Sequence, residues 1–214
     1  MIQVYLYCEG ITDYEPICIF MRKANRLSEF VVTRKTRKDL REEITLLSGR
    51  RGIHKHVTDI DRLAMTAKKA KCMHIAYHQD ADGNDTDVYE SITKKFAKYA
   101  DTCACIAIVP KEMIESWLLA DEHAYGAVFG SKPERFPKYP EELWGRKEDP
   151  DSNYPKNVMK RILKQYNKAL NRNIYIDIAE HSNLDTLKAH CPKSFVRFYN
   201  DMQGFALTRI TTKR

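Results

Sequence analysis

The sequence has little of what marks a fibrous, secreted or membrane protein. Eight glycines and eight prolines among 214 residues exclude a collagen-like or low-complexity chain. No apolar run approaches the ~18 residues that a membrane span needs. The opening residues, MIQVYLYCEG, lack the basic region and the small-residue cleavage site of a signal peptide. We therefore expect a soluble, cytoplasmic protein that does not associate with membranes.

Cysteine patterns that bind zinc are also missing. The six cysteines form no Cys-x-x-Cys pair and no Cys/His cluster with zinc spacing. Several lie inside apolar, strand-like runs, as reduced core thiols do. Apolar residues make up 43% of the chain, which is enough to build a sizeable core. The length fits one domain, or one domain with an appendage.

Excess positive charge is confined to one part of the chain. The net charge is +7, but residues 22–71, the basic segment, hold 15 Lys and Arg against 6 Asp and Glu. All the other residues together are slightly negative. A basic patch of this kind suggests a polyanionic partner such as DNA or RNA, although a solvated basic surface gives the same pattern.

Strand-like apolar runs alternate with helical patterns in the first 129 residues. This alternation predicts an α/β fold with a mostly parallel sheet flanked by helices. The expected strands are 2–7, 29–33, 73–77 and 103–109. The expected helices are 14–25, 38–47, 58–71, 87–99 and 111–121.

After residue 129 the sequence pattern changes first to a proline-rich segment and then to helical periodicity. Five of the eight prolines lie among charged residues in 130–155, which predicts a long loop or lid. Helical periodicity then returns in the C-terminal part. The expected organisation is an α/β domain in 1–129, a proline-rich loop in 130–155, and a helical extension in 156–214 packed on the same domain.

Acidic residues follow three of the four predicted strands. Glu9 and Asp13 come after the first, Asp80 and Asp82 after another, and Glu115 lies on the helix after the last. In an open α/β sheet, ligands bind beyond the carboxyl ends of the strands. Two aspartates one residue apart can converge on one cation, and Mg²⁺ takes a few carboxylates while keeping waters for a substrate phosphate. The pattern therefore suggests a metal site at this edge.

Each acid also has an ordinary structural explanation. Residues 80–85 can form a solvated acidic turn, Asp13 can cap a helix, and Glu115 can pair with Lys111. His78 can be a general base, but a core or supporting histidine is the simpler interpretation. An EF-hand is excluded because the bidentate Glu at its twelfth position is missing. The coincidence of three acidic strand ends favours a shared site.

Two of these motifs, with others, resemble a known family. Glu-Gly-x-Thr-Asp at 9–13 and Asp-x-Asp-Gly at 80–83 are similar to the Toprim domains of topoisomerases, primases and overcoming-lysogenization-defect nucleases. The closer resemblance is to small bacterial Toprim-like proteins. In these proteins a strand that ends in proline leads into a helix with the pattern Glu-x-Trp-Leu-Leu-Ala-Asp, which this chain has at 115–121. Their C-terminal part has a lysine-containing helix, matched here by Lys156, and a Cys-Pro-x-x-Phe motif, matched here at 191–195. The basic segment and the proline-rich loop match poorly.

This resemblance implies Mg²⁺- or Mn²⁺-dependent phosphodiester chemistry with two ions. It places one cation on Asp80 and Asp82, and it makes Glu9 a ligand of the second or a general acid/base. Asp13 would assist Glu9, Glu115 would complete the metal shell, and Lys156 would stabilise transition-state charge. Two cations ~3.5–4 Å apart can stabilise both the attacking and the leaving oxygen.

The function expected from these observations is a nuclease that uses a metal-activated water on DNA or RNA. One alternative is a non-catalytic module that binds nucleic acid or a partner. Another is a different Mg²⁺-dependent phosphoryl-transfer enzyme, although haloacid-dehalogenase-like phosphatases carry Asp-x-Asp after the first strand, where this chain has Glu9. The resemblance also implies an ATPase partner and a role in phage defence.

The basic segment lies between Glu9 and the Asp80/Asp82 turn in the sequence. The fold must therefore bring its ends near the acids, where cationic side chains would offset the repulsion between metal-binding carboxylates and a phosphate backbone. The residues expected to contact nucleic acid are Arg34, Lys35, Arg37 and Lys38.

Overall fold

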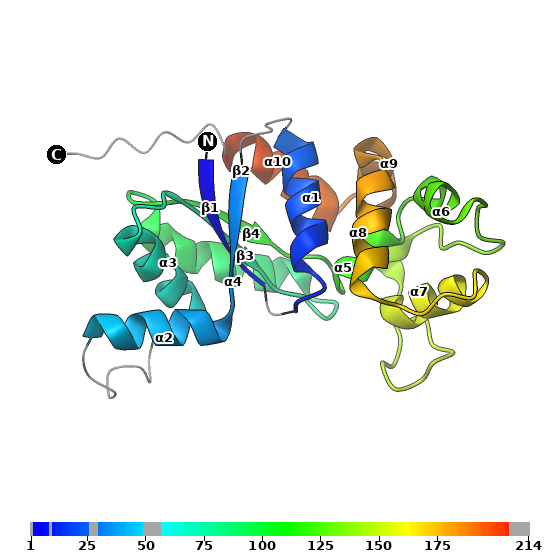
Figure 1. Cartoon of the computed structure of the whole chain (residues 1–214), viewed down its shortest axis with the longest axis horizontal. Helices are drawn as coiled ribbons and strands as arrows, with labels where there is room; N and C mark the ends of the chain where they lie inside the picture. The colour runs from blue at the N-terminus through cyan, green and yellow to red at the C-terminus, as the bar shows by residue number, and fades with distance from the viewer. Residues whose placement is uncertain (1, 9, 26–29, 49–56, 206–214) are drawn as a thin grey trace.

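The computed structural model describes residues 2–8, 10–25, 30–48 and 57–205, with backbone only for 43–48. Its centre is a four-stranded parallel sheet in the order β2-β1-β3-β4. The strands are β1 (Ile2–Tyr7), β2 (Phe30–Lys35), β3 (His74–His78) and β4 (Ala104–Ile108). The α/β fold with a parallel sheet is therefore confirmed (Figure 1).

Both faces of the sheet are covered, which explains why β1 is apolar at nearly every position. Val4 and Leu6 face one core, and Tyr5 and Tyr7 face the other. The first core is covered by α1 (Tyr14–Asn25) and α10 (Ser194–Phe205). The second is covered by α2 (Arg37–Ser48), α3 (Asp59–Lys69) and α4 (Asp85–Phe96), which a short 3₁₀ turn (Ala97–Tyr99) extends (Figure 1).

A capping box starts α3, and Asp61 is its acidic member. The Asp61 carboxylate accepts hydrogen bonds from Thr58 N (2.9 Å), Thr58 Oγ1 (2.6 Å) and the Tyr99 hydroxyl (2.6 Å). Burial opposes ionisation of this carboxyl, but these hydrogen bonds lower the pKa of Asp61 below its usual value. The ionised group therefore stabilises the folded state.

We expect Asp61→Asn to lower the free energy of unfolding by about 1 kcal/mol at pH 7. A carboxyl whose pKa is lowered by folding stabilises above the unfolded pKa of ~3.9, and this contribution is lost as pH falls through the lower folded value. The difference between wild type and Asp61→Asn should therefore shrink below about pH 4. Urea unfolding across pH measures it, and a difference independent of pH would contradict the assignment.

The single helix expected over 111–121 is wrong. Residues 111 and 112 instead use their carbonyls to accept hydrogen bonds from the turn after β3: Gly83 N to Lys111 O (2.9 Å) and Asp82 N to Glu112 O (3.2 Å). Met113 is extended, so α5 covers only Ile114–Leu118. A further helix, α6 (Glu122–Phe129), begins at an Asp121 cap and ends at Gly130, which has φ +83°.

The proline-rich loop is irregular apart from a 3₁₀ turn at Pro140–Glu142, and side chains fasten it to the helical extension. Buried Glu141 accepts hydrogen bonds from the backbone N–H groups of Lys193 (2.9 Å) and Ser194 (2.7 Å) at the start of α10. Asn157 donates to three loop carbonyls between residues 146 and 149. These contacts tie both halves of the loop to neighbouring helices.

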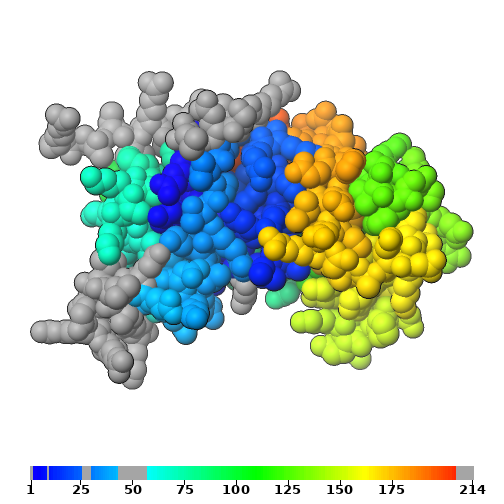
Figure 2. Space-filling view, viewed as in Figure 1, coloured from blue at the N-terminus to red at the C-terminus, as the bar shows by residue number. Residues whose placement is uncertain are grey.

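The helical extension shares the first core with the sheet. It contains α7 (Pro155–Lys164), α8 (Arg172–His181), α9 (Leu184–His190) and α10. Helix α8 packs beside α1 and α6, and Lys23 of α1 donates to the carbonyls of Ala179 (2.9 Å) and Ser182 (2.9 Å) at its C-terminal end. Figure 2 shows α8 (yellow to orange) lying directly against α1 (blue).

Trp117 joins these elements from the centre. Its side chain is fully buried among Phe20, Phe195 and Phe198, and its indole N–H donates to Ser194 Oγ (2.8 Å). Within the described ranges, no helix has both the length and the apolar character needed to cross a bilayer.

Candidate functional site

The strand order has a reversal at the carboxyl ends of β1 and β3. These two strands are neighbours, yet the chain leaves β1 toward β2 on one side and leaves β3 toward β4 on the other. A reversal of this kind is a topological switch point, where open α/β sheets bind their ligands. Cys8 follows β1 and His78 ends β3, so both lie at this point, as do the segments that carry Asp13 and Asp80.

His78 lies between two of the predicted metal ligands. Its side chain is 1% exposed, with Nε2 3.3 Å from Asp80 Oδ1 and Nδ1 4.0 Å from Asp13 Oδ2. Burial alone would lower the pKa of His78, but Asp80 and Cys8 hold it well above its usual value. Asp80 and Cys8 therefore favour the charged form of the imidazole, which lies buried between Asp13 and Asp80.

Asp13 is held by close packing. It is buried, and Thr12 Oγ1 donates to its Oδ1 (3.1 Å). A Cβ on Gly10 would collide with Asp13 Oδ2, so the backbone approaches the carboxylate at a distance that only glycine permits. The glycine of the Glu-Gly motif thus has a local packing reason. Glu9 itself lies outside the described residues.

The turn after β3 has an unusual backbone. Asp82 has φ +48° and Gly83 has φ +94°, and the two N–H groups donate to the carbonyls of Glu112 and Lys111. Aspartate tolerates this left-handed region, and glycine prefers it. The turn is therefore fastened to the loop after β4, which fixes Asp82 beside Glu112.

Glu112 is the residue that sequence reasoning missed. Glu112 as a whole residue is 6% exposed, but its carboxylate oxygens are not among the buried side-chain atoms that lack a hydrogen-bond partner. Burial raises the pKa of Glu112, the nearby Asp82 and Asp80 raise it further, and Lys111 opposes them. The available signal was its place two residues after the strand-ending Pro110, but the Glu-x-Trp pattern drew attention to Glu115 instead.

The carboxylate of Glu115 is contacted by two other side chains of the protein. Glu115 is 3% exposed, accepts a hydrogen bond from the Tyr175 hydroxyl, and lies 3.7 Å from Lys156 Nζ. Burial raises the pKa of Glu115, while Tyr175 and Lys156 lower it. The sequence indicated a metal or a basic partner for this carboxylate, and Lys156 rather than Lys111 is the basic partner.

Tyr154 faces the acids from the end of the proline-rich loop. Burial raises its pKa to about 12, with further contributions from Glu115, Asp82, Asp80 and Glu112, in that order. It directly precedes α7, which begins with Pro155 and Lys156. The start of α7 therefore brings a hydroxyl and an ammonium group to the same edge of the sheet, an approach that the sequence pattern did not reveal.

The four basic candidates differ in their surroundings. Arg34 and Lys35 end β2 opposite Leu6 and Tyr7, so they lie at the acidic edge, and Arg34 is among the groups that lower the pKa of Cys8 against the larger effect of burial. Lys35 is 9% exposed and lies over the Tyr5 ring (4.4 Å).

The other two lie at the start of α2. Arg37 Nε contacts Asp59 Oδ2 (2.7 Å), but the Arg37 side chain remains 55% exposed. Lys38 is 83% exposed and 3.8 Å from Glu42. Arg34, Arg37 and Lys38 thus have groups that can reach a phosphate, whereas Lys35 is mainly a packing residue.

The predicted metal ligands do not form one preformed cluster. Asp80 and Asp82 share a turn, Asp13 lies across His78 from Asp80, and Glu115 is paired with Lys156. Leaving aside Glu9 and the other positions outside the described ranges, no three His, Cys, Asp or Glu side chains are arranged to hold a metal ion. Carboxylates that repel one another are expected to stay apart until a cation joins them.

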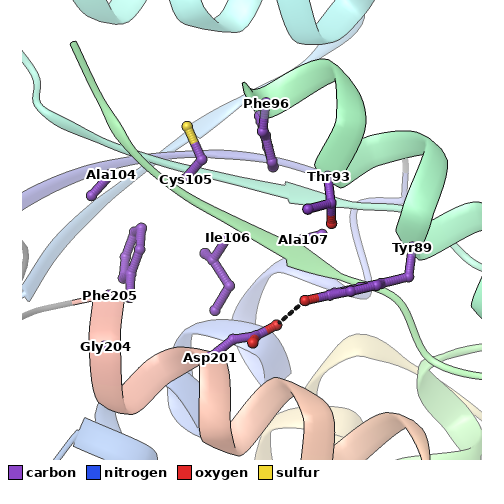
Figure 3. Close-up of a pocket in the computed structure, with 10 residues that line it drawn as sticks. All are labelled: Tyr89, Thr93, Phe96, Ala104, Cys105, Ile106, Ala107, Asp201, Gly204 and Phe205. Carbon is purple, nitrogen blue, oxygen red and sulfur yellow. Dashed lines mark hydrogen bonds between the residues drawn. The ribbon is translucent and has the colours of Figure 1, made fainter. Parts of the chain in front are cut away.

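Two cavities lie elsewhere in the molecule. One, of about 250 Å³, runs along β4 between α4 and α10, where Tyr89 donates to Asp201 (2.8 Å) across the cavity (Figure 3). The other, of about 620 Å³, is lined by α6, α9 and residues 136–138. Neither contains the acids of the switch point.

Searches with this chain against protein-family models, curated proteins and solved structures gave no match. The fold and site define a parallel α/β protein whose switch point gathers carboxylates beside a fully buried histidine.

Proposed function

We propose that this chain is a Toprim-like, metal-dependent nuclease that hydrolyses phosphodiester bonds of DNA or RNA. One observation carries the proposal: Asp80 and Asp82 share a turn at the switch point, and that turn is hydrogen-bonded to the segment that carries Glu112. Oxygen donors of this kind suit Mg²⁺ or Mn²⁺. The fit rests on this donor set.

The residues of the site take the following roles in this proposal. Asp80 and Asp82 hold the cation, and His78 orients Asp80 by contacting its Oδ1. Bound metal would supply an activated water and offset charge on the phosphodiester oxygens. Lys156, which is 38% exposed beside Glu115, faces the same edge and stabilises the charge of the phosphate. Glu9 and Asp13 are proposed for a second cation, as the resemblance implies.

A second candidate is a non-catalytic nucleic-acid-binding module of the same fold. It is favoured by the observation that, in the described part of the chain, no three side chains are poised around a metal. The basic residues at the end of β2 and the start of α2 would then bind phosphate without hydrolysis. The resemblance alone supports an ATPase partner and phage defence, and the genes beside this one would test both.

The deciding experiment incubates the purified chain with DNA, tRNA and bulk RNA. We expect cleavage with Mg²⁺ or Mn²⁺, none in excess chelator, and recovery when the metal is restored, because hydrolysis depends on the metal-bound water. Ca²⁺ at the same ionic strength controls for non-specific charge screening. Cleavage that persists in excess chelator would contradict the metal assignment. Metal-independent binding without cleavage of any substrate would favour the second candidate.

A further inference from the structure

We infer that this chain binds single-stranded nucleic acid and that Trp144, on the proline-rich loop, stacks on one of its bases. The inference rests on the proposed function, because it names the form of nucleic acid that the same site takes. It concerns binding alone, so it does not require that the bound strand be cleaved.

Trp144 is the most exposed of the large apolar side chains in the part of the chain that the structure describes. Its exposed fraction is 73%, whereas the other tryptophan, Trp117, is fully buried. The backbone is extended at Leu143, which packs against the first core, so the next side chain is directed away from that core. An indole is a large, mainly apolar surface that usually finds a partner in a fold or an interface. Its exposure here leaves a flat aromatic face available to a ligand.

The loop that carries Trp144 is fastened on both sides of it. Before Trp144, Glu141 accepts hydrogen bonds from the N–H groups at the start of α10. After it, Asn157 donates to the carbonyls of residues 146, 147 and 149, and Arg161 donates to those of residues 150 (2.6 Å) and 152 (2.7 Å). Because these contacts already fix the backbone, stacking of a base on Trp144 would order little further chain, which lowers the entropic cost of binding.

The same packing brings Trp144 toward the carboxyl edge of the sheet. A Cβ on Gly145 would lie 2.8 Å from the backbone N of Tyr154, so the residue after Trp144 is in close contact with the start of α7. In Figure 1 this part of the loop (yellow-green) lies below α7. Helix α7 packs against α5, and Lys156 Nζ lies 3.7 Å from Glu115. A strand with a base on Trp144 can therefore continue past Lys156 toward the acids.

Helix α7 also supplies cations for the phosphates of such a strand. Lys156, Lys160 and Lys164 recur at four-residue intervals, so they lie on one face of the helix. Lys156 is 38% exposed, and the other two are exposed. An aromatic side chain beside a row of cations is the arrangement by which proteins hold single strands. Bases in a duplex are already paired and stacked on their neighbours, so only an unpaired base offers its face to Trp144.

The test follows binding to the intact chain in excess chelator, where metal-dependent cleavage does not occur. Oligothymidylate and oligouridylate of about 12 nucleotides should quench the fluorescence of exposed Trp144 and leave that of buried Trp117 unchanged. Trp144→Ala should weaken the binding of both strands at least ~5-fold, because one stacked base is lost. The wild type should bind these strands more tightly than a duplex of the same length.

Controls separate stacking from charge and from apolar contact. A strand of abasic sites has the same phosphates but no bases, so Trp144→Ala should bind it within about twofold of wild type. Trp144→Phe keeps an aromatic face and should retain most of the affinity, whereas Trp144→Leu keeps only apolar area and should bind as Trp144→Ala does. None of these substitutions changes charge, so the salt slope should stay at its wild-type value.

The outcomes separate the inference from the proposed function. Wild-type affinity in Trp144→Ala, an equal loss for intact and abasic strands, or a preference for the duplex would overturn the inference while leaving metal-dependent cleavage intact. Strand binding that depends on Trp144, in a chain that cleaves no nucleic acid, would support the inference and favour the second candidate over the nuclease. Failure of the wild type to bind any strand, in chelator or with Ca²⁺, would overturn both.

Discussion

Replacing Asp82 with Asn is expected to abolish cleavage while leaving the metal-free protein as stable as wild type, or more stable. Asp82 is exposed and repels Glu112, so neutralising it relieves repulsion without breaking a contact that holds the fold. Asparagine also tolerates the left-handed φ of +48° at this position. Loss of a direct metal ligand should reduce turnover by more than ~100-fold, which exceeds the usual effect of residues that only support a ligand.

Asp80→Asn should be compared with Asp82→Asn, because the two variants are expected to differ in stability. It should abolish cleavage to the same extent, but it should also lower the free energy of unfolding by about 1–3 kcal/mol, because fully buried His78 loses the carboxylate 3.3 Å from Nε2. Single-turnover cleavage measures the catalytic loss, and urea unfolding in chelator measures stability without metal. Equal destabilisation by both substitutions, with no change in metal binding, would show that the turn is structural.

Neutralising Arg34, Arg37 and Lys38 together with Gln is expected to weaken nucleic-acid binding for all sequences alike. Each phosphate contact releases counterions and contributes about −0.7 to −0.9 to the log–log salt slope. Three contacts would flatten the slope by roughly two to three units. Lys35 is left unchanged, because its burial over Tyr5 makes it a stability residue rather than a phosphate ligand.

The matched control neutralises three lysines at the opposite edge of the sheet. Lys68 lies near the end of α3, and Lys94 and Lys98 lie at or just beyond the end of α4. Their removal changes net charge by the same amount, so it should leave most of the slope intact. Filter binding at several salt concentrations gives both slopes. Equal flattening by the two triple variants would show a non-specific charge effect and exclude a defined interface at the end of β2 and the start of α2.

The sequence predicted some elements better than others. β1 and α1 were predicted at their observed bounds, because their apolar patterns are continuous and their ends carry clear breaks. Helix α8 was not predicted, although Ile174, Tyr175 and Ile178 are buried in it. The local signal was nevertheless present, because Asn171 caps α8 and its buried residues have helical spacing.

The loop after β4 shows a limit of such local signals. Lys111 and Glu112 continue a helical pattern in the sequence, yet their carbonyls are taken by the N–H groups of Gly83 and Asp82. A partner almost thirty residues away therefore decided the start of α5. Local propensity is a weak influence that such tertiary hydrogen bonds override.

The sequence by itself determined the alternation of strands and helices, the parallel sheet, and the presence of acids at its carboxyl edge. These follow from apolar periodicity and from the direction in which parallel strands run, both of which are local or topological properties. Only the tertiary structure decided which acids are compensated. It placed His78 between Asp13 and Asp80, paired Glu115 with Lys156, and set Glu112 beside the turn that carries Asp82. The charge balance of a site is a sum over neighbours from distant segments, and that sum exists only once the chain has folded.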